Sequence, residues 1–564
     1  MPGMVAQRLG PRASWGPNTY PLLLIVQAWV AMLVVINPLG NFPVIDDWAY
    51  FASVKALVDH GQLFLSNWTA FNLLSQIAWG AVFASIFGTS YTVLRFSTLV
   101  LALLGAGALY LTLLESGSER RTALLGSLLF LFNPLVCILS ASFMSDVPYV
   151  AAQTVAMLLL IRGLKSRSKK QLGSGWFIAG LALLCRQVGM AIPIGFGAAK
   201  LAKAQSVWRA ILASAAPFLA FAAIQFLLQA GLRHWDALPA GFGRQIDLIF
   251  SNISNSSALT LAGNVLLLGI DCARFVGLSL LPLSVLTIAQ FTRKLPRVIT
   301  TLIWSWLTIL ALLVASVEPS MLTWTNVAWS VIGPDVAGAP LPRTFWSVVS
   351  IASAFGGMAL VFAVMLQSIA LFKNLRNTAA IPALFSIVTA AALFASMALL
   401  PRDKQFDRYI VPLIPCFIIF LASRFGAAPS MDEPIPRWAA IASNAGFAAV
   451  AAWAVLGTHD YLAEKRVQWD ALQDLVQNDH IPPEVIDAGW VYNAPTSYGV
   501  YGDPNRSETW FRRQNYLVVS NMLPALAGAR GLTQLRDYPV ARWAPWNRVP
   551  ARIIVLRRNQ VRNE

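Results

Sequence analysis

Long apolar segments separated by short polar loops make up most of the chain before about residue 458. Segments of roughly 15–25 mostly apolar residues are long enough to cross the hydrocarbon core of a bilayer as helices. When basic clusters such as "RGLKSRSKK" (162–170) are assigned to cytoplasmic loops, the segments alternate consistently and number about 13. The pattern therefore predicts an all-α polytopic membrane domain over residues 1–457, with about 13 transmembrane helices and a cytoplasmic N-terminus that is an uncleaved signal anchor.

Two segments depart from this simple alternation. The segment 71–88 is apolar, but counting it as a span would place the basic pair at 120–121 outside, so we interpret it as an interfacial or re-entrant helix. The next true span is then expected at about 91–114. The segment 176–200 has two short apolar halves around Arg186, which predicts two short spans that meet at an outer turn.

The composition changes at about Thr458. The segment 459–480 has the pattern of an amphipathic helix, and "VIDAGWVYN" (485–493), "YLVVSN" (516–521) and "ARIIVLRRN" (551–559) have the pattern of short strands. We predict a small α+β domain over residues 458–564 in the periplasm. Two roles are open for it: packing on the outer face, or covering a substrate.

Composition supports a membrane protein and excludes other classes. The 564 residues are 57% hydrophobic and 12% charged, and the mean hydropathy is +0.60. The net charge of +16 is explained by cytoplasmic loops, so no nucleic-acid partner is expected. The four cysteines lie in or beside apolar stretches, and the four histidines form no HxxxH or HxxE cluster, so neither disulfides nor a structural metal site is expected.

Carboxylates gather in the loops assigned to the outer side. Asp46 and Asp47 follow the first span in "VIDDWAY", and Asp146 lies in the second outer loop, in "SASFMSDVPYV". For the adjacent pair, helix capping and ordinary loop charge are alternatives to a catalytic role. For Asp146 the alternative is an N-cap, because Pro148 suits the first turn of the next helix. Two short outer loops would thus present three carboxylates at one face of the membrane.

Basic residues also occur on this face, against the usual distribution. Arg402 and Arg408 belong to "PRDKQFDRYIVPLIP", a loop that the alternation places outside, and this indicates an anionic partner. The alternative is that Asp403 and Asp407 neutralise the cluster. Arg186 stands alone at its turn near the bilayer edge, where an arginine needs a headgroup, a carboxylate or a phosphate.

A polar pair inside the membrane supports a different class of function. Asp271 and Arg274 lie three positions apart in "LLLGIDCARFVGL", on one face of a helix, where they are expected to neutralise each other. Such a pair, together with the half-length spans, also occurs in multi-span transporters. A transporter is therefore the alternative function, although the carboxylates gather in outer loops and no internal repeat is visible.

Taken together, these motifs resemble the membrane-embedded glycosyltransferases of GT-C type, and are similar to the protein mannosyltransferases and the aminoarabinose transferases that modify lipid A. The resemblance rests on the order of "DDWAY", "SDVPY" and "DRYIVPLIP" along the chain. The usual motif in the first outer loop is Asp-Glu, and this chain has Asp-Asp. Asp46 therefore takes the first position and Asp47 the second, with a shorter side chain.

The resemblance implies an inverting transfer of a sugar from a polyprenyl-phosphate donor to a lipid, glycan or protein acceptor. The expected site has three groups of residues: catalytic Asp46, Asp47 and Asp146; Arg186, Arg402 and Arg408 at the donor phosphate; and the aromatic residues Trp48, Tyr50 and Tyr409 at the substrates. Asp46 would be the general base, with Asp146 orienting the acceptor or tuning Asp46. The arginines would stabilise the leaving phosphate.

The same resemblance places the enzyme in the bacterial inner membrane, in contact with membrane lipids and with its site on the periplasmic face. No cofactor is required by the motifs. A divalent ion such as Mg²⁺ or Mn²⁺ stays open, since three carboxylates could hold one while the arginines could make it unnecessary.

Overall fold

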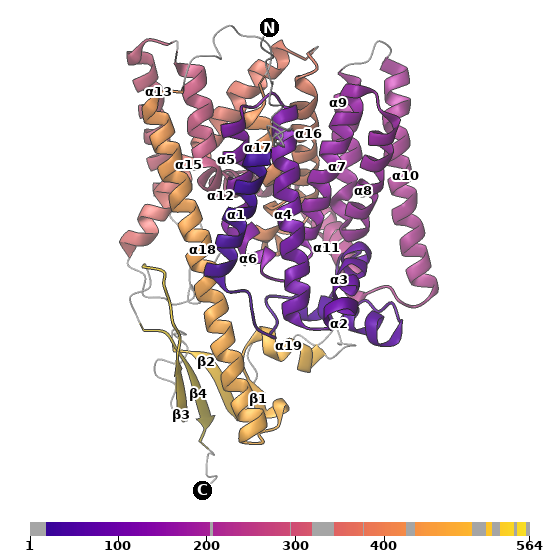
Figure 1. The fold of residues 1–564 in the computed structure, drawn as a ribbon, viewed down its shortest axis with the longest axis vertical. Coiled ribbons are helices and arrows are strands. Elements are labelled where there is room, and N and C mark those ends of the chain that lie inside the picture. The colour runs from indigo at the N-terminus through magenta and orange to yellow at the C-terminus, as the bar shows by residue number, and fades with distance from the viewer. Residues whose placement is uncertain are drawn as a thin grey trace, which may run out of the picture.

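The computed structural model describes residues 19–202, 207–293, 295–317, 343–375, 377–424, 435–498, 515–521, 531–545 and 550–559. Most of these residues are helical, and the helices form one bundle with a small sheet beyond one end (Figure 1). Within the described ranges, nine helices are long and apolar enough to cross a membrane, or ten if one bent pair counts as a span. The chain is thus a multi-pass membrane protein, and the predicted number of about 13 spans is not confirmed.

The first half of the bundle contains the helices that surround the outer loops. Its elements are α1 (Thr19–Ile36), α2 (Asp47–His60), α3 (Leu74–Phe87), α4 (Tyr91–Glu115), α5 (Arg120–Leu131), α6 (Pro134–Ser140), α7 (Asp146–Ser166), α8 (Lys169–Cys185), η1 (Gln187–Met190) and α9 (Ala191–Leu201). Backbone groups in a bilayer must be satisfied within the chain, which is why these apolar segments are helical.

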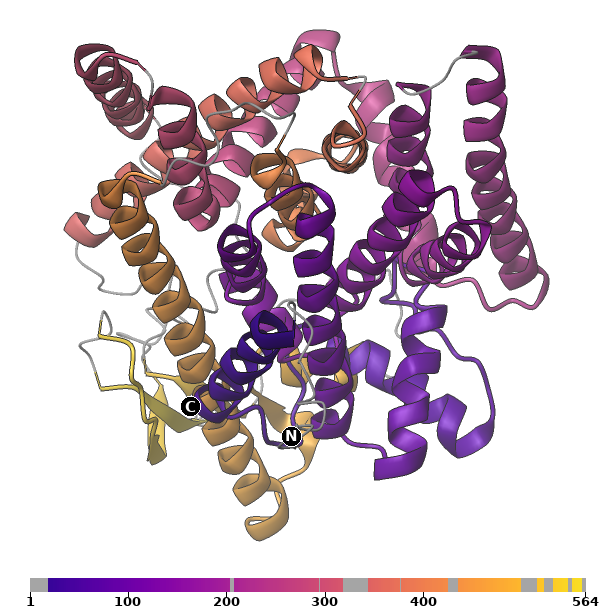
Figure 2. The ribbon, with the colours of Figure 1, turned by 45° about the horizontal axis from the view of Figure 1, so that its top comes forward.

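The second half completes the bundle and leads into the sheet. Its helices are α10 (Val207–His234), α11 (Ala240–Asn255), α12 (Ala258–Thr292), α13 (Arg297–Val317), α15 (Arg343–Lys373), α16 (Ala380–Ala398), η2 (Arg402–Lys404), η3 (Asp407–Ile410), α17 (Leu413–Ala422) and α18 (Arg437–Gln473). In both overall views α10 stands at the outer edge of the bundle (Figures 1 and 2).

The two irregular segments form short helices. Helix α3 has only 14 residues, too short to cross, and it lies beside α2 at the end of the bundle nearer the sheet (Figure 1). The following span, α4, starts at Tyr91 as expected. Helices α8 and α9 are 17 and 11 residues long, and Arg186 lies at the break between them.

The C-terminal segment has a four-stranded sheet in the order β1-β2-β4-β3. Its strands are β1 (Ile486–Asp487), β2 (Tyr516–Ser520), β3 (Leu532–Pro539) and β4 (Arg552–Arg558). Strand β1 pairs parallel with β2, and the other pairs are antiparallel. Helix α18 runs without a break through the expected domain boundary at 457/458, so that boundary stays a prediction.

Two details of this segment differ from the sequence interpretation. Strand β3 was not expected, because six of its eight residues are exposed and its alternation is weak. The stretch 490–493 is the start of helix α19 (Trp490–Tyr498) rather than part of a strand. Gly489, with φ of 78°, ends the strand by adopting a conformation that favours glycine.

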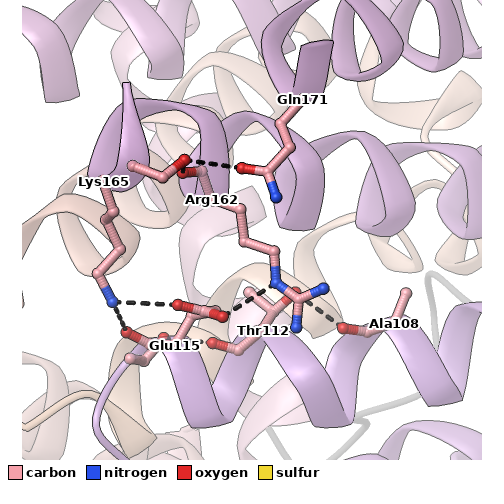
Figure 3. A network of polar contacts seen from close by, with 8 residues as sticks. Ala108, Thr112, Glu115, Arg162, Lys165 and Gln171 are labelled. Atoms are coloured by element: carbon pink, nitrogen blue, oxygen red, sulfur yellow. Dashed lines mark hydrogen bonds and ion pairs between the residues drawn. The ribbon is translucent and has the colours of Figure 1, made fainter. Parts of the chain in front are cut away.

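The C-terminal ends of α4 and α7 are joined by an ion-pair network (Figure 3). The Glu115 carboxylate at the end of α4 accepts hydrogen bonds from Arg162 Nε at 2.9 Å and from Lys165 Nζ at 3.2 Å, both on α7. Arg162 and Lys165 belong to the basic cluster that the sequence assigns to the cytoplasm. The contact fixes the ends of α4 and α7 relative to each other, and because it is partly exposed its stabilisation is modest.

Candidate active site

The site is built around Asp46, which lies at the N-cap position of α2. Its side chain makes no capping hydrogen bond. Instead Oδ2 accepts from Arg408 Nη1 at 2.9 Å, and Oδ1 accepts from the indole Nε1 of Trp490 at 3.1 Å. Capping is therefore the wrong explanation for this carboxylate, which is 8% exposed and held by two residues far along the chain.

Asp47 has a different environment although it is the next residue. Its Oδ1 accepts from the backbone N–H of Val44 at 2.7 Å, and its Oδ2 from that of Phe143 at 3.2 Å. Burial raises the pKa of Asp47 to about 7, although the Arg95 charge and these two N–H groups oppose the shift. The Asp47 carboxyl therefore connects the loop before α2 to the loop before α7, and each of its oxygens accepts a hydrogen bond from a backbone N–H.

Arg95 fixes the loop that carries the two aspartates, and the sequence reasoning missed it. This fully buried arginine on α4 donates from Nη1 to the carbonyl of Pro38 at 2.6 Å and from Nη2 to that of Phe42 at 2.9 Å. Its guanidinium also lies 4.8 Å from the centre of the Phe42 ring. A lone arginine within an apolar span was the available signal, because such residues are costly unless they have a role.

Asp146 is paired with Arg186 in a buried ion pair; the two side chains are 1% and 4% exposed. The alternative interpretation of Asp146 as an N-cap does not hold, because Ser145 occupies that position and the Asp146 carboxylate pairs with Arg186. The Arg186 guanidinium also lies 3.9 Å from the ring centre of Phe71 and 5.7 Å from that of Tyr409. Opposite charge, rather than helix capping, decides the orientation of this carboxylate.

Arg408 and Tyr409 reach the site from the short helix η3. The guanidinium of Arg408, paired with Asp46, lies 5.8 Å from the ring centre of its neighbour Tyr409. Tyr50 of α2 is buried beside them, and burial raises its pKa, while Arg408, Asp46, Asp146 and Arg186 all act on it electrostatically. The two ion pairs, Asp46 with Arg408 and Asp146 with Arg186, therefore lie around one tyrosine.

The structure pairs Arg402 with a carboxylate outside this cluster. Its guanidinium pairs with Asp271 of α12, and Lys404 pairs with Asp403 at 2.9 Å on the exposed surface. The described hydrogen bonds of Arg274 run to Ser353 Oγ at 3.2 Å and Ser350 Oγ at 2.9 Å on α15.

Three tryptophans lie beside Asp46 on the side of the sheet. Ring centres of Trp48 and Trp68 are 6.4 Å apart, and those of Trp68 and Trp490 are 4.7 Å apart. They come from α2, from the loop before α3 and from α19 respectively. The sequence analysis named Trp48 among the substrate residues, whereas Trp490 lies in a tail in which no motif was recognised.

An apolar cavity of about 560 Å³ adjoins the cluster. Its walls come from η1, α9, α10, α11 and α16, and are formed mostly by aliphatic and aromatic side chains. Arg186, Phe71 and Tyr409 also line it, so the Asp146–Arg186 pair faces an apolar space. The volume lies in the range of ordinary small-ligand sites.

The three carboxylates do not form a metal-ligand set. Among the described residues, no group of three histidine, cysteine, aspartate or glutamate side chains is placed to hold an ion. Asp46, Asp47 and Asp146 are each engaged by nitrogen donors instead.

The site thus combines residues from separate parts of the chain. One of these parts matches a known protein family. Residues 77–235 match the family model described as dolichyl-phosphate-mannose-protein mannosyltransferase. The matched segment contains Asp146 and Arg186. The resemblance to the mannosyltransferases that the motifs indicate is confirmed over this range, and the match supports glycosyl transfer as the class of activity. No curated protein sequence matches the chain.

Solved structures of membrane glycosyltransferases show distant likeness. ArnT of Cupriavidus metallidurans, solved with bound undecaprenyl phosphate, is 14% identical; the match covers 96% of this chain and 98% of ArnT with a TM-score of 0.40. The Archaeoglobus fulgidus oligosaccharyltransferase tethered to an acceptor peptide is 14% identical, with 82% and 58% coverage and a TM-score of 0.42. Because these scores are low, the functional proposal rests on the family match and the geometry of the site.

Proposed function

We propose that this protein is an inverting glycosyltransferase that moves a sugar from a polyprenyl-phosphate donor to an acceptor on the outer face of the bacterial inner membrane. The observation that carries the proposal is the pair of buried Asp–Arg ion pairs beside an apolar cavity. The family match supports it, since the family is described by a dolichyl-phosphate sugar donor, which is a polyprenyl phosphate.

The donor has an apolar tail and a charged phosphate, and the site has a suitable environment for each. A polyprenyl tail needs an apolar space, which the cavity between α9, α10, α11 and α16 provides. The phosphate needs N–H donors: the Nε atoms of Arg186 and Arg408 are buried and have no hydrogen-bond partner among the described residues. A buried donor without a partner is costly, so both atoms are well suited to phosphate oxygens.

Arg402 is less well placed to bind the phosphate. It is held by Asp271, although its own buried Nη1 has no partner in the described structure. We therefore propose Arg186 and Arg408 as the principal phosphate ligands. Arg402 would reach the same group only after leaving its ion pair.

Asp46 is the proposed general base. Its Oδ1 would accept the proton of the acceptor hydroxyl as the acceptor oxygen attacks the anomeric carbon from the face opposite the phosphate, which inverts that carbon. The electrons of the breaking C1–O bond pass to the phosphate, whose growing charge Arg186 and Arg408 stabilise in a buried site. Asp146 orients Arg186, Asp47 holds the loop, and Tyr50, Tyr409 and Trp48 contact the substrates.

A multi-span transporter is the alternative function. That interpretation was based on Asp271 and Arg274 as part of a polar pathway through the membrane. Their described contacts run to Arg402 and to two serines of α15, which is a structural role for both residues. The cavity, moreover, is lined by Arg186 at the carboxylate cluster. These contacts favour an enzyme.

Mass spectrometry of envelope glycolipids and glycans tests the proposal. Cells lacking the gene are compared with cells that carry the wild type, Asp46→Asn, or Asp59→Asn, which alters an exposed carboxylate of the same helix. We expect one sugar-modified species to disappear on deletion and to return with the wild type and Asp59→Asn only. An Asp46→Asn protein that is present in the membrane at normal level and restores the species would overturn the proposal.

A further inference from the structure

Both oxygens of the proposed base are occupied. Oδ2 of Asp46 accepts from Arg408, and Oδ1 accepts from the Trp490 indole at 3.1 Å. A general base must bring one oxygen within about 2.6–3.2 Å of the hydroxyl whose proton it takes. Since Arg408 is needed at the donor phosphate, Oδ1 is the oxygen left for the acceptor. The Trp490 N–H therefore occupies the position of the acceptor hydroxyl.

The indole is delivered from outside the bundle by an ordered turn. Asn493 accepts from the backbone N–H of Ala488 at 3.2 Å and donates to Asp487 Oδ1 at 2.8 Å, which fixes the chain between β1 and α19. Trp490 follows directly and is only half-buried. Helix α19 packs against α2, which begins beside Asp46. The C-terminal segment thus covers the base from the aqueous side.

Groups suited to a sugar surround this position. Trp48 and Trp68 lie next to Trp490 and present aromatic surface. The Trp48 Nε1 and Thr69 Oγ1 atoms are buried without a hydrogen-bond partner among the described residues, and the two side chains are 4% and 1% exposed. An aromatic face binds the apolar C–H face of a pyranose ring, and an unpaired donor binds one of its hydroxyls.

The tryptophans are not part of the wall of the apolar cavity. The cavity is lined by Arg186, Phe71 and Tyr409, whereas none of Trp48, Trp68 and Trp490 lines it. In-line displacement at a sugar carbon requires the acceptor and the leaving phosphate to be on opposite faces. An acceptor bound at the tryptophans and a donor tail bound in the cavity would use different residues of the site.

We propose that the acceptor is a sugar that reaches Asp46 from the side of the C-terminal segment, displaces Trp490 and binds against Trp48 and Trp68. Trp490 then acts as a cap that prevents water from using Asp46 when no acceptor is bound. The inference rests on the proposed function, because it names the acceptor class of the same site. It also makes a claim about access to Asp46 that holds whether or not sugar transfer is shown.

Carboxylate labelling measures that access directly in the full-length protein in nanodiscs. A carbodiimide with glycine ethyl ester modifies exposed carboxylates, and peptide mass spectrometry follows Asp46, with Asp59 as the internal reference. We expect slow labelling of Asp46 in the wild type and labelling about 10-fold faster in Trp490→Phe, which keeps the ring but loses a hydrogen bond to a charged group. Trp490→Ala should label faster still.

A matched variant separates this effect from general loosening of the C-terminal segment. Trp543 lies in the same segment but stacks on His459, with ring centres 3.9 Å apart. Trp543→Phe should label at the wild-type rate. Equal labelling of Asp46 in the wild type, Trp490→Phe and Trp490→Ala would overturn the capping role.

Small probes test the acceptor class in the uncapped Trp490→Ala protein. Methyl pyranosides should slow the labelling of Asp46, and the further change Trp68→Ala should remove this protection. Glycerol and N-acetylthreonine amide at equal concentration should not protect. Protection by the threonine amide without protection by any pyranoside would overturn the assignment of a sugar acceptor.

The two proposals fail separately. If Trp490 shields Asp46 but Asp46→Asn restores the envelope product, then the proposed function is wrong while the cap stands. If Asp46→Asn abolishes the product but Trp490 variants do not change labelling, then the enzyme stands and the cap is wrong.

Discussion

Arg408 donates to Asp46 across 362 positions of sequence, at 2.9 Å, and both side chains are almost fully buried. The contact joins the loop after α1 to the loop before α17. Burying a single unpaired charge is very costly in free energy, so each residue offsets the cost of burying the other. In the proposed function the pair places a cation for the donor phosphate next to a base for the acceptor hydroxyl.

Replacement of Arg408 should affect both stability and donor binding. Arg408→Ala leaves Asp46 buried without its cation, and removing one partner of such a pair costs about 3–5 kcal/mol. We expect a lower melting temperature and a binding constant for undecaprenyl phosphate weakened by at least about 10-fold. Thermal unfolding and lipid-binding titrations in detergent measure the two effects.

The double variant Asp46→Asn/Arg408→Met separates the effect on stability from the effect on donor binding. It removes both charges, so most of the melting temperature should return, because replacing both partners of a buried pair is often neutral. Binding of undecaprenyl phosphate should stay weak. Normal lipid binding in the double variant would remove Arg408 from the phosphate site.

Arg95 should prove more important for folding than its distance from the chemistry suggests. Arg95→Leu removes the donors to the Pro38 and Phe42 carbonyls and should cost about 3–5 kcal/mol, since several buried polar groups lose their partners. Thr92→Ala is the graded control, because Thr92 Oγ1 donates to the Gly40 carbonyl of the same loop at 2.9 Å. That variant should cost about 1 kcal/mol. Equal effects of the two variants on thermal unfolding would contradict this order.

Asp47 should make stability depend on pH. Burial raises its pKa from the ordinary value of 3.8 to about 7 in the folded protein. Between these values the folded chain holds a proton that the unfolded chain has released, so the stabilising contribution is complete below pH 3.8 and decreases as pH rises to about 7. The slope is about 1.4 kcal/mol per pH unit within this window.

The variant Asp47→Asn isolates this contribution, because an amide does not titrate. Its melting temperature should change less than that of the wild type between pH 5 and pH 7. The variant is less stable at low pH, since an amide accepts with one oxygen where the protein offers two N–H donors. Parallel pH profiles of the two proteins would show that Asp47 does not titrate in this range.

Filling the apolar cavity should weaken binding of the lipid. Ala395 of α16 lines the cavity, whereas Ala391, one turn earlier on the same helix, is exposed and does not line it. Ala395→Trp should weaken undecaprenyl phosphate binding by about 10-fold or more through lost apolar contact. Ala391→Trp should bind as the wild type does. Similar binding by both variants would place the tail elsewhere.

The sequence indicated several of these residues because their signals are local. Asp46 and Asp47 are adjacent after a span, and Arg186 interrupts an apolar stretch, so each is conspicuous without any knowledge of packing. The alternation of basic loops then assigned Asp46, Asp146, Arg186 and Arg408 to one face. In the structure each of these two aspartates is paired with one of the two arginines.

Elsewhere the structure adds to or differs from what the sequence indicated. Asp146 had the spacing of an N-cap, which was the alternative to a catalytic role, but its carboxylate pairs with Arg186 instead. Arg402 looked equivalent to Arg408, yet it pairs with Asp271 on α12 and not with a carboxylate of the cluster. The stretch at 490–493 had strand-forming residues, but Gly489 and the side chain of Asn493 turn it into a helix.

The sequence directly gives the length, hydrophobicity and charge of each segment, and membrane insertion depends on these local properties. The sequence by itself therefore determined a polytopic helical protein with its acidic loops on one side. Which carboxylate meets which arginine, that Arg95 holds the loop, and that Trp490 reaches Asp46 were decided only by the tertiary structure. The physical reason is that a buried ion pair or hydrogen bond joins groups hundreds of residues apart, and its partner is chosen by the packing of helices rather than by neighbours in the chain.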